Sequence, residues 1–351
     1  MGNLLAYSGI VTKLHAMEAK LLTDENFHEI AALHTVPEVV QYLRDNSSYT
    51  DVLNRLNDDQ LHRGSIEKLL TQGLYHEYSK IYSFCNMEQR KFMKLYIKRY
   101  EIDLIKYCFR MVINENSDLL ELSYKKNFFD KYSSLSIDDL ISSQSIDELI
   151  ESLKGSEYYS PLKNLLHLPS ITLFDYDLAL DQYYFSILWK DRKKLLKKKE
   201  LEIYTRDYGS QIDLLNLQWI YRAKKYYHMA SSEVYKMLIP IQYKLSTDFI
   251  KALVGAPDDE AFKNLLQKTV YAKYADFANL NKSDTAEQIY TKCMYHLLTR
   301  DRRKNPYSIA SINTYLFLKE EELKKLTTAI ECIRYSLTPD ETLSYVGGNN
   351  R

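Results

Sequence analysis

The feature that most limits the possible folds of this chain is a pattern that recurs three times with a period near 110 residues. The segment 101–110 matches 213–222, and 322–331 is the third copy. Each copy begins with an acidic residue (Glu101, Asp213 or Glu322), and an aromatic residue stands five positions before each acid. A chain that repeats in this way is expected to fold as repeated structural units.

A second pattern occurs earlier in each copy. Residues 148–155 (ELIESLKG) are matched one hundred positions later by 248–255 (DFIKALVG), and 38–43 (EVVQYL) have a similar acid–apolar start. Two patterns that recur in the same order are poorly explained by chance. Because the period far exceeds the 20–50 residues of solenoid repeats, each copy should be a small domain. We predict three repeats in a pseudo-threefold arrangement, with the boundaries 1–115, 116–229 and 230–351.

The residues that start, end and interrupt helices are distributed as in a helical protein. The 351 residues include only 9 Gly and 7 Pro, whereas average usage would give about 25 and 18. Helix-capping patterns occur at Ser145–Glu148, Ser210–Asp213 and Thr338–Glu341. Gly155 and Gly255 follow amphipathic stretches and are expected in the left-handed conformation that ends helices. Alternating strand patterns are absent, so we predict an all-α fold.

Composition narrows the functional classes. The 47 Lys and Arg balance 47 Asp and Glu, whereas a nucleic-acid binder would normally carry a basic excess. The four cysteines are widely spread without a CxxC pair, which favours a reduced, intracellular protein. The start of the chain lacks a basic signal-peptide region, and no uncharged apolar run approaches 18 residues. We expect a protein that can lie beside a membrane without crossing it.

The motifs of common catalytic and cofactor sites are missing from the sequence. There is no GxxxxGK[ST] or GxGxxG loop to hold phosphates, no HExxH or Cys/His cluster for zinc, and no GxSxG turn. Paired carboxylates are common, but they are not diagnostic in a chain with so many acids. We therefore predict no catalytic residues, no metal, no cofactor and no direct nucleotide binding.

Basic clusters precede each copy of the first pattern. They consist of Arg90, Lys91, Lys94, Lys98 and Arg99; seven Lys or Arg within 190–199; and Arg300, Arg302, Arg303 and Lys304. One interpretation is that they are solvated helix faces. The other is a basic rim that faces anionic lipid or the acidic loops of a membrane partner.

The repeated helices also supply candidate partner contacts. Their apolar residues at helical spacing are best explained as core. Arg110 and Arg222 end equivalent segments, where they either oppose the helix dipole or face an acidic partner. The candidate partner-interface residues are Glu101, Lys106, Arg110, Asp213, Gln218, Arg222, Glu322, Arg302 and Arg303.

Several segments resemble one known family. They are 16–25 (AMEAKLLTDE), 101–110, 213–222, and 305–310 (NPYSIA) followed by 315–323 (YLFLKEEEL). Over nearly the whole chain the sequence resembles the C subunit of V-type and archaeal-type (V/A-type) rotary ATPases, whose eukaryotic counterpart is the d subunit. One position departs from the family, because the third copy ends in Glu331 where relatives often have Arg.

The resemblance implies an all-helical, funnel-shaped protein of three similar bundles. It would be a non-catalytic central-stalk (rotor) subunit, peripheral on the cytoplasmic face of the membrane. Its partners would be the central-shaft subunits and the membrane rotor ring, with no nucleic acid. It would couple shaft rotation to proton or sodium transport; the choice of ion and the direction of the reaction are not encoded in this chain. The alternative is a soluble all-helical scaffold or adaptor, and an all-α enzyme is a weaker third interpretation.

Overall fold

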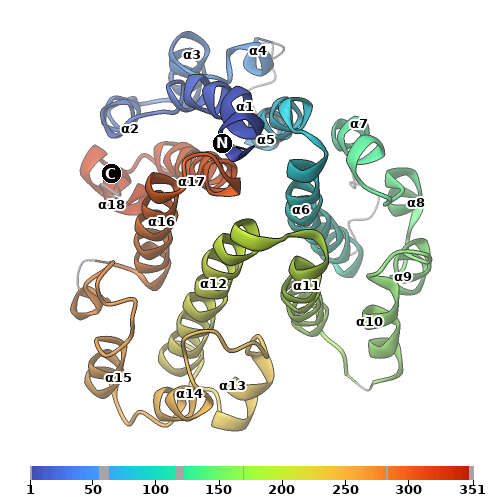
Figure 1. Cartoon of the computed structure of the whole chain (residues 1–351), viewed down its shortest axis with the longest axis vertical. Helices are drawn as coiled ribbons and strands as arrows, with labels where there is room; N and C mark the ends of the chain where they lie inside the picture. Colours follow the sequence, from blue (N-terminus) through green and yellow to red (C-terminus); the bar gives the residue numbers. More distant parts are fainter. Residues whose placement is uncertain (1, 55–62, 115–121, 169, 282–283, 348–351) are drawn as a thin grey trace. The chain divides into compact units, whose positions relative to one another are not determined.

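The computed structural model describes residues 2–54, 63–114, 122–168, 170–281 and 284–347 (Figure 1). These residues form helices joined by short connections, and within them the only β contact is an isolated bridge between Leu280 and Asp284. The predicted all-α class is confirmed. The predicted arrangement of three bundles about a pseudo-threefold axis stays a prediction.

The chain forms two compact units. Unit 1 consists of Met1–Asn86 and Leu298–Arg351, and unit 2 is Met87–Leu297. Unit 1 contains α1 (Gly2–Glu18), α2 (Asp24–Ala31), α3 (Val36–Asn46), α4 (Thr50–Leu53), α5 (Arg63–Phe84), α17 (Ile309–Arg334) and α18 (Pro339–Val346). Helix α16 (Ala286–Lys304) crosses the boundary between the units.

Unit 2 contains two kinds of helix. The long ones are α6 (Met87–Ile113), α11 (Leu173–Leu195) and α12 (Lys198–Lys225). The short ones are α7 (Ser123–Tyr132), α8 (Ile137–Ser142), α9 (Ile146–Ser152), α10 (Tyr159–Lys163), α13 (Ser231–Met237), α14 (Thr247–Val254) and α15 (Asp259–Leu266), with 3-10 turns η3 (Asn164–His167) and η4 (Phe277–Asn279).

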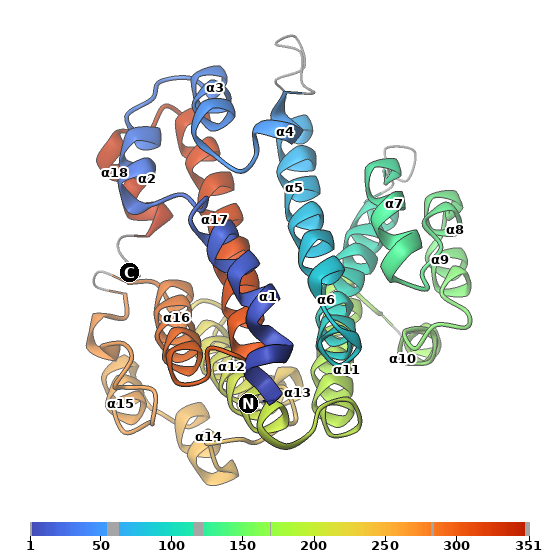
Figure 2. The ribbon, with the colours of Figure 1, turned by 45° about the horizontal axis from the view of Figure 1, so that its top comes forward.

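Unit 1 is built from both ends of the chain around one apolar core. Helix α17 packs against α1, α5 and α18, and the short helices α2 and α3 also lie against it (Figure 2). The buried core includes Leu43 and Leu53 from the N-terminal segment and Leu326 and Ile330 from α17. The first and last parts of the sequence therefore fold together.

In unit 2 the long helices support rows of short ones. Helices α6 and α11 lie side by side, and α7 to α10 form a row beside them, with α9 against α6 and α10 against α11 (Figure 1). Helices α13 and α14 pack on α12. Long helices thus carry the repeated segments, and short capped helices cover them.

The cap predictions had mixed outcomes. Ser145 and Thr338 cap α9 and α18 as expected, and Gly155 has a positive φ of 91°. The predicted helix start at Ser210–Asp213 is wrong, because both residues lie buried in the middle of α12. Gly255 is also not left-handed; it continues the right-handed conformation with φ −80°. Tertiary burial therefore overrides local cap patterns inside a long helix.

Candidate functional site

The three repeated segments lie on three long helices. Residues 101–110 belong to α6, 213–222 to α12 and 322–331 to α17. The acid that begins each segment is buried, with Glu101 7%, Asp213 1% and Glu322 5% exposed. A buried carboxylate must be compensated by hydrogen bonds or by a cation, so the partners of each acid are informative.

Glu101 is held by hydroxyl groups from the row of short helices. The Tyr158 hydroxyl donates to it at 2.5 Å, and the Ser133 hydroxyl donates to its other carboxylate oxygen. Burial and the charge of Glu101 raise the pKa of Tyr158 well above its ordinary value. Tyr158 therefore stays protonated and remains a hydrogen-bond donor.

Asp213 occupies the same position on α12. The Tyr271 hydroxyl donates to its carboxylate at 2.7 Å, and the backbone N–H of Lys244 donates at 2.8 Å. Burial raises the pKa of Asp213 to about 6, although these hydrogen bonds act in the opposite direction. Because no lysine or arginine side chain is among the hydrogen-bond partners that the structure gives this carboxylate, it is held by neutral donors.

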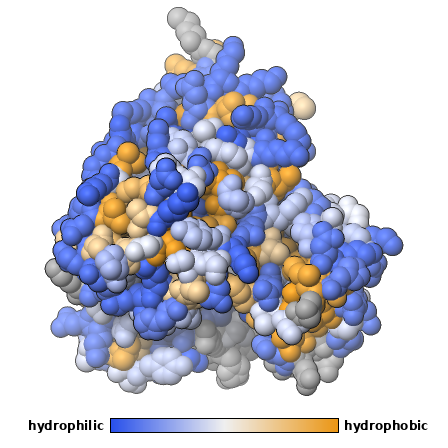
Figure 3. Space-filling model, turned by 90° about the horizontal axis from the view of Figure 1, so that it is seen from below, coloured by the Kyte–Doolittle hydropathy of each residue, from blue (hydrophilic) through white to orange (hydrophobic). Residues whose placement is uncertain are grey.

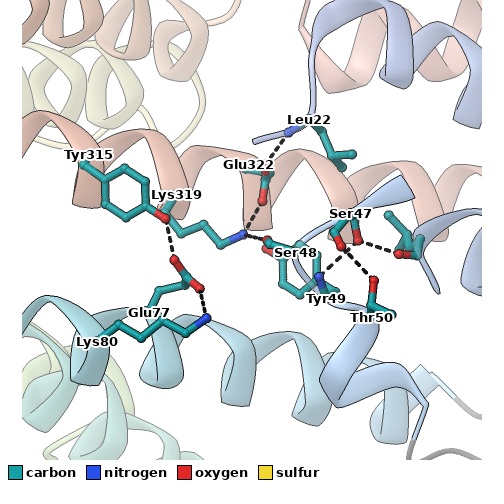
Figure 4. Close-up of polar contacts among 11 residues, drawn as sticks. Leu22, Ser47, Ser48, Tyr49, Thr50, Glu77, Lys80, Tyr315, Lys319 and Glu322 are labelled. Atoms are coloured by element: carbon teal, nitrogen blue, oxygen red, sulfur yellow. Dashed lines mark hydrogen bonds and ion pairs between the residues drawn. The ribbon is translucent and has the colours of Figure 1, made fainter. Parts of the chain in front are cut away.

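Glu322 has a cation beside it. Lys319 donates to one carboxylate oxygen at 2.5 Å, and the backbone N–H of Leu22 donates to the other at 2.6 Å (Figure 4). The Lys319 ammonium also lies 3.9 Å from the ring centre of Tyr49. The Tyr49 hydroxyl approaches Glu322 without forming a hydrogen bond of normal geometry. Burial, with the charge of Glu322 second, raises the pKa of Tyr49 well above its ordinary value.

The three sites share a local construction, which we call the acid–tyrosine pairs: Glu101–Tyr158, Asp213–Tyr271 and Glu322–Tyr49. Two positions before each tyrosine, a hydroxyl side chain accepts a hydrogen bond from the tyrosine N–H. These residues are Ser156, Thr269 and Ser47, at 3.2, 3.3 and 3.1 Å. The triplication in the sequence thus extends to a triplication of contacts within the units.

The residue three positions before the acid adds to this pattern. Lys98 forms an ion pair with Glu157, next to Tyr158, and Lys319 donates to Ser48, next to Tyr49, at 2.8 Å. In the remaining copy Ser210 stands at this position and lowers the pKa of Tyr271 through a hydrogen bond. The three pairs therefore differ in the cation at this position: Lys98 pairs with the residue beside the tyrosine, Lys319 pairs with the acid itself, and the copy with Ser210 has no lysine here.

Sequence reasoning singled out the acids but missed the tyrosines. The signal that could have found them is Ser or Thr two positions before Tyr at 47–49, 156–158 and 269–271, again spaced by about 110 residues. With 31 tyrosines in the chain this signal is weak. In the contact pattern, α9 precedes Tyr158 as α15 precedes Tyr271, so these two helices are equivalent. The sequence match between 148–155 and 248–255 had instead paired α9 with α14.

The other predicted interface residues differ in exposure and partners. Lys106 pairs with Asp181 at 2.6 Å, and Arg302 pairs with Glu18 at 2.7 Å. Gln218 and Arg222 both donate to Glu287, at 2.9 and 3.0 Å. The structure therefore brings Gln218 and Arg222 together. They lie one turn apart on α12, against the start of α16.

Two further arginines, Arg110 and Arg303, are exposed. Arg110 ends the repeated segment of α6, as Arg222 (44% exposed) ends that of α12. Residues with accessible cations can contact a partner without first breaking the fold. The assignment of all nine residues to a partner interface stays a prediction, and Arg110, Arg222 and Arg303 are the exposed ones among them.

The basic clusters lie where two long helices meet. The first begins α6, the second spans the end of α11 and the start of α12, and the third ends α16. Lys91, and after it Lys197, lowers the pKa of Glu88, so a lysine of the second cluster acts on an acid beside the first. Arg192 of the second cluster is not available to a partner, because it is buried and its guanidinium carbon lies 3.4 Å from the ring centre of Trp189.

The surface of the described residues is mixed in hydropathy. On the face drawn in Figure 3, hydrophobic residues form separate patches among hydrophilic ones. No helix of the described residues is long and apolar enough to cross a membrane, and those residues contain no group of three or more His, Cys, Asp or Glu that could hold a metal.

Comparison with known proteins gives a consistent result over nearly the whole chain. The family model for the ATP synthase (C/AC39) subunit matches residues 10–345. The chain is 25% identical over 359 residues to the A-type ATP synthase C subunit of Methanocaldococcus jannaschii, covering 97% of this chain and 86% of that protein. The protein of the same name is 26% identical in Pyrococcus abyssi (97% and 90% covered) and 28% identical in Methanosarcina barkeri (91% and 87% covered).

Proposed function

The chain belongs to the ATP synthase (C/AC39) subunit family, and we propose that it is the non-catalytic central-stalk (rotor) subunit of a V/A-type rotary ATPase. In this role it joins the rotating shaft to the membrane rotor ring and couples ATP turnover to proton or sodium transport. The observation that carries the proposal is the similarity to an A-type ATP synthase C subunit along 97% of the chain.

The proposed partners are the other subunits of such a complex. The central-shaft subunits would contact the polar ends of the repeated helices, including the exposed Arg110 and Arg222 and the half-buried Gln218. The membrane rotor ring would face the basic clusters, which would hold the protein at the cytoplasmic face of the membrane. We expect no direct binding of nucleotide or nucleic acid and no cofactor.

We propose further that the protein has three bundles, each with one acid–tyrosine pair. Glu101–Tyr158 and Asp213–Tyr271 span 57 and 58 positions, whereas Glu322 reaches back to the N-terminal segment for Tyr49. Each bundle would thus draw on two neighbouring sequence repeats of 1–115, 116–229 and 230–351. The last repeat would close onto the first, which agrees with the core that both ends of the chain share.

Removal of this protein from the assembled complex tests the coupling role. In reconstituted vesicles we expect ATP hydrolysis by the soluble head to persist while ATP-driven ion uptake is lost. Adding the purified chain back should restore uptake. Undiminished ion uptake without the protein would overturn the proposal and favour a helical scaffold or adaptor.

Charge reversal tests the contacts with the partners. Arg110→Glu or Arg222→Glu should weaken coupling by about 1–3 kcal/mol of interface free energy, measured as loss of binding to the purified shaft subunits. Lys154→Glu is the control, because Lys154 is 72% exposed and lies outside the repeated helices. Equal binding by all three variants would exclude these arginines from the interface.

A further inference from the structure

Unit 1 contains a polar cavity that the proposed coupling role does not use. It has a volume of about 220 Å³ and lies between α1, the 47–51 segment and α5. Three lysines line it: Lys13 from α1, Lys20 from the turn that follows α1, and Lys80 from α5. Ser48 also lines the cavity, and its hydroxyl accepts a hydrogen bond from Lys319 of α17 (Figure 4).

The charges around the cavity leave a positive excess. Glu77 lines the cavity, but one of its oxygens accepts from Lys80 at 3.0 Å and the other from the Tyr315 hydroxyl at 2.6 Å. Neither Lys13 nor Lys20 pairs with a carboxylate in the part of the chain that the structure describes. Asp51, at the exposed rim, is the one remaining acid of the lining.

The hydrogen-bond donors are arranged for a ligand with several acceptor oxygens. Ser48 uses its oxygen to accept from Lys319, so its own proton is available to donate. Thr50 and Ser47 instead donate to backbone carbonyls, so they contribute less. The Lys13 ammonium lies 5.4 Å from the ring centre of Phe84, a weak contact that leaves its protons free to donate. The ammonium groups of Lys13 and Lys20 and the Ser48 proton therefore remain as donors to a ligand.

We propose that this cavity binds a compact oxyanion of the phosphate class. A tetrahedral phosphate has enough oxygens to accept from Lys13, Lys20 and Ser48 at once, and lysine is a common phosphate ligand in proteins. The bound anion would bridge α1 to the 47–51 segment. Because Ser48 is bonded to Lys319 on α17, the anion would also reinforce the join between the two ends of the chain.

The lining also decides against larger ligands. Its apolar side chains are only Ala16 and Met17, so a nucleobase would find no aromatic ring to stack on. A volume near 220 Å³ suits phosphate or pyrophosphate. The phosphate group could be free in solution or part of a lipid headgroup, and the two sources require separate measurements.

The test uses the whole chain. Calorimetric titration with inorganic phosphate and with pyrophosphate, at constant ionic strength, measures the soluble source. Flotation with phosphatidylcholine vesicles, with and without phosphatidylinositol 4-phosphate, measures the headgroup. The double variant Lys13→Gln/Lys20→Gln should bind about a hundredfold more weakly, because each of the two charge-assisted contacts contributes about a factor of ten.

A matched control and a second variant separate binding from folding. Lys251→Gln/Lys324→Gln removes two exposed lysines of other helices and should leave binding unchanged. Ser48→Ala should weaken binding less than the lysine pair, because it removes one neutral donor. Melting curves without ligand should be similar for the native chain and the Lys13/Lys20 variant.

Each outcome has a defined meaning. Binding to soluble phosphate that the Lys13/Lys20 variant loses supports a free anion, and binding only to phosphoinositide vesicles that it loses supports a headgroup. Binding that is equal in the native chain and the Lys13/Lys20 variant overturns the proposal. Absence of binding to phosphate and pyrophosphate at millimolar concentration, together with absence of binding to the phosphoinositide vesicles, also overturns it. Neither result bears on the rotor role.

Discussion

Asp213 in unit 2 and Glu322 in unit 1 are equivalent in sequence but are compensated by different means. Asp213 has a hydroxyl and a backbone N–H as donors, and burial raises its pKa to about 6. Glu322 has the Lys319 ammonium at 2.5 Å, and this lysine is 1% exposed. A buried carboxylate can thus be held by dipoles or by a cation, with different consequences for stability.

The repeats therefore keep their geometry more strictly than their electrostatics. Each acid faces a tyrosine whose N–H is held by the hydroxyl two positions earlier. The residue three positions before the acid, in contrast, is lysine in two copies and serine in the other. Substitutions at the acids, at their tyrosines and at this third position should separate the contribution of charge from that of geometry.

The largest effect should come from removing the buried cation. Lys319→Met leaves Glu322 charged and without its ion-pair partner, which should lower the free energy of unfolding by about 3–5 kcal/mol. Urea denaturation measures this value. Lys324→Met, at a lysine 57% exposed further along α17, should cost less than about 1 kcal/mol. Similar losses in the two variants would contradict the role given to Lys319.

The next effect is a pH dependence that arises at Asp213 in unit 2. The pKa of Asp213 is raised from 3.8 to about 6, so the folded state favours the protonated form. The stabilisation that comes from protonated Asp213 in the folded state is present at low pH. It is lost as the pH rises from about 4 to about 6. Two pKa units correspond to roughly 3 kcal/mol.

Asp213→Asn removes this titration. Between pH 4.5 and 7.5 the native chain should lose roughly 2–3 kcal/mol relative to the variant, as measured by denaturation at both pH values. Asp248→Asn, at a side chain 93% exposed, should follow the native chain. Parallel behaviour of the Asp213→Asn variant and the native chain would show that Asp213 is not protonated in this range.

The sequence predicted the scaffold better than the site, for a physical reason. Apolar spacing and scarce glycine act locally, so helices over 101–110, 213–222 and 322–331 could be predicted. The partners of the acids come from 57 and 58 positions away, or from the other end of the chain, and no local pattern encodes them. Ser210–Asp213 resembled a helix start for the same reason. The residues that Asp213 contacts in the folded chain are distant in sequence, so the local pattern did not reveal them.

A smaller effect should follow from removing the tyrosine hydroxyls of unit 2. Tyr158→Phe and Tyr271→Phe each leave a buried carboxylate with one donor fewer, which should cost about 1–3 kcal/mol of unfolding free energy. Tyr271→Phe should also raise the pKa of Asp213 further, because the hydroxyl now lowers it. Tyr345→Phe, at a side chain 65% exposed, is the control and should be close to neutral. Neutral behaviour at both sites would mean that these hydroxyls are not needed to hold the acids.

The smallest effect should come from the same change in unit 1. The Tyr49 hydroxyl is buried and lacks a hydrogen bond of normal geometry, while Lys319 and the Leu22 N–H already satisfy Glu322. Tyr49→Phe keeps the ring beneath the Lys319 ammonium and should change the free energy of unfolding by no more than about 0.5 kcal/mol, measured by urea denaturation.

The ring of Tyr49, in contrast with its hydroxyl, should matter. It lies so close to α5 that a Cβ on Gly73 would stand 2.9 Å from it, and a cation lies over its face. Tyr49→Leu should therefore cost several times more than Tyr49→Phe, at about 2–4 kcal/mol, because it loses both packing and the cation–π contact. If Tyr49→Phe were instead as costly as Tyr271→Phe, the hydroxyl would be a true donor to Glu322. The three acid–tyrosine pairs would then differ only in the residue three positions before the acid, which is Lys98, Ser210 or Lys319.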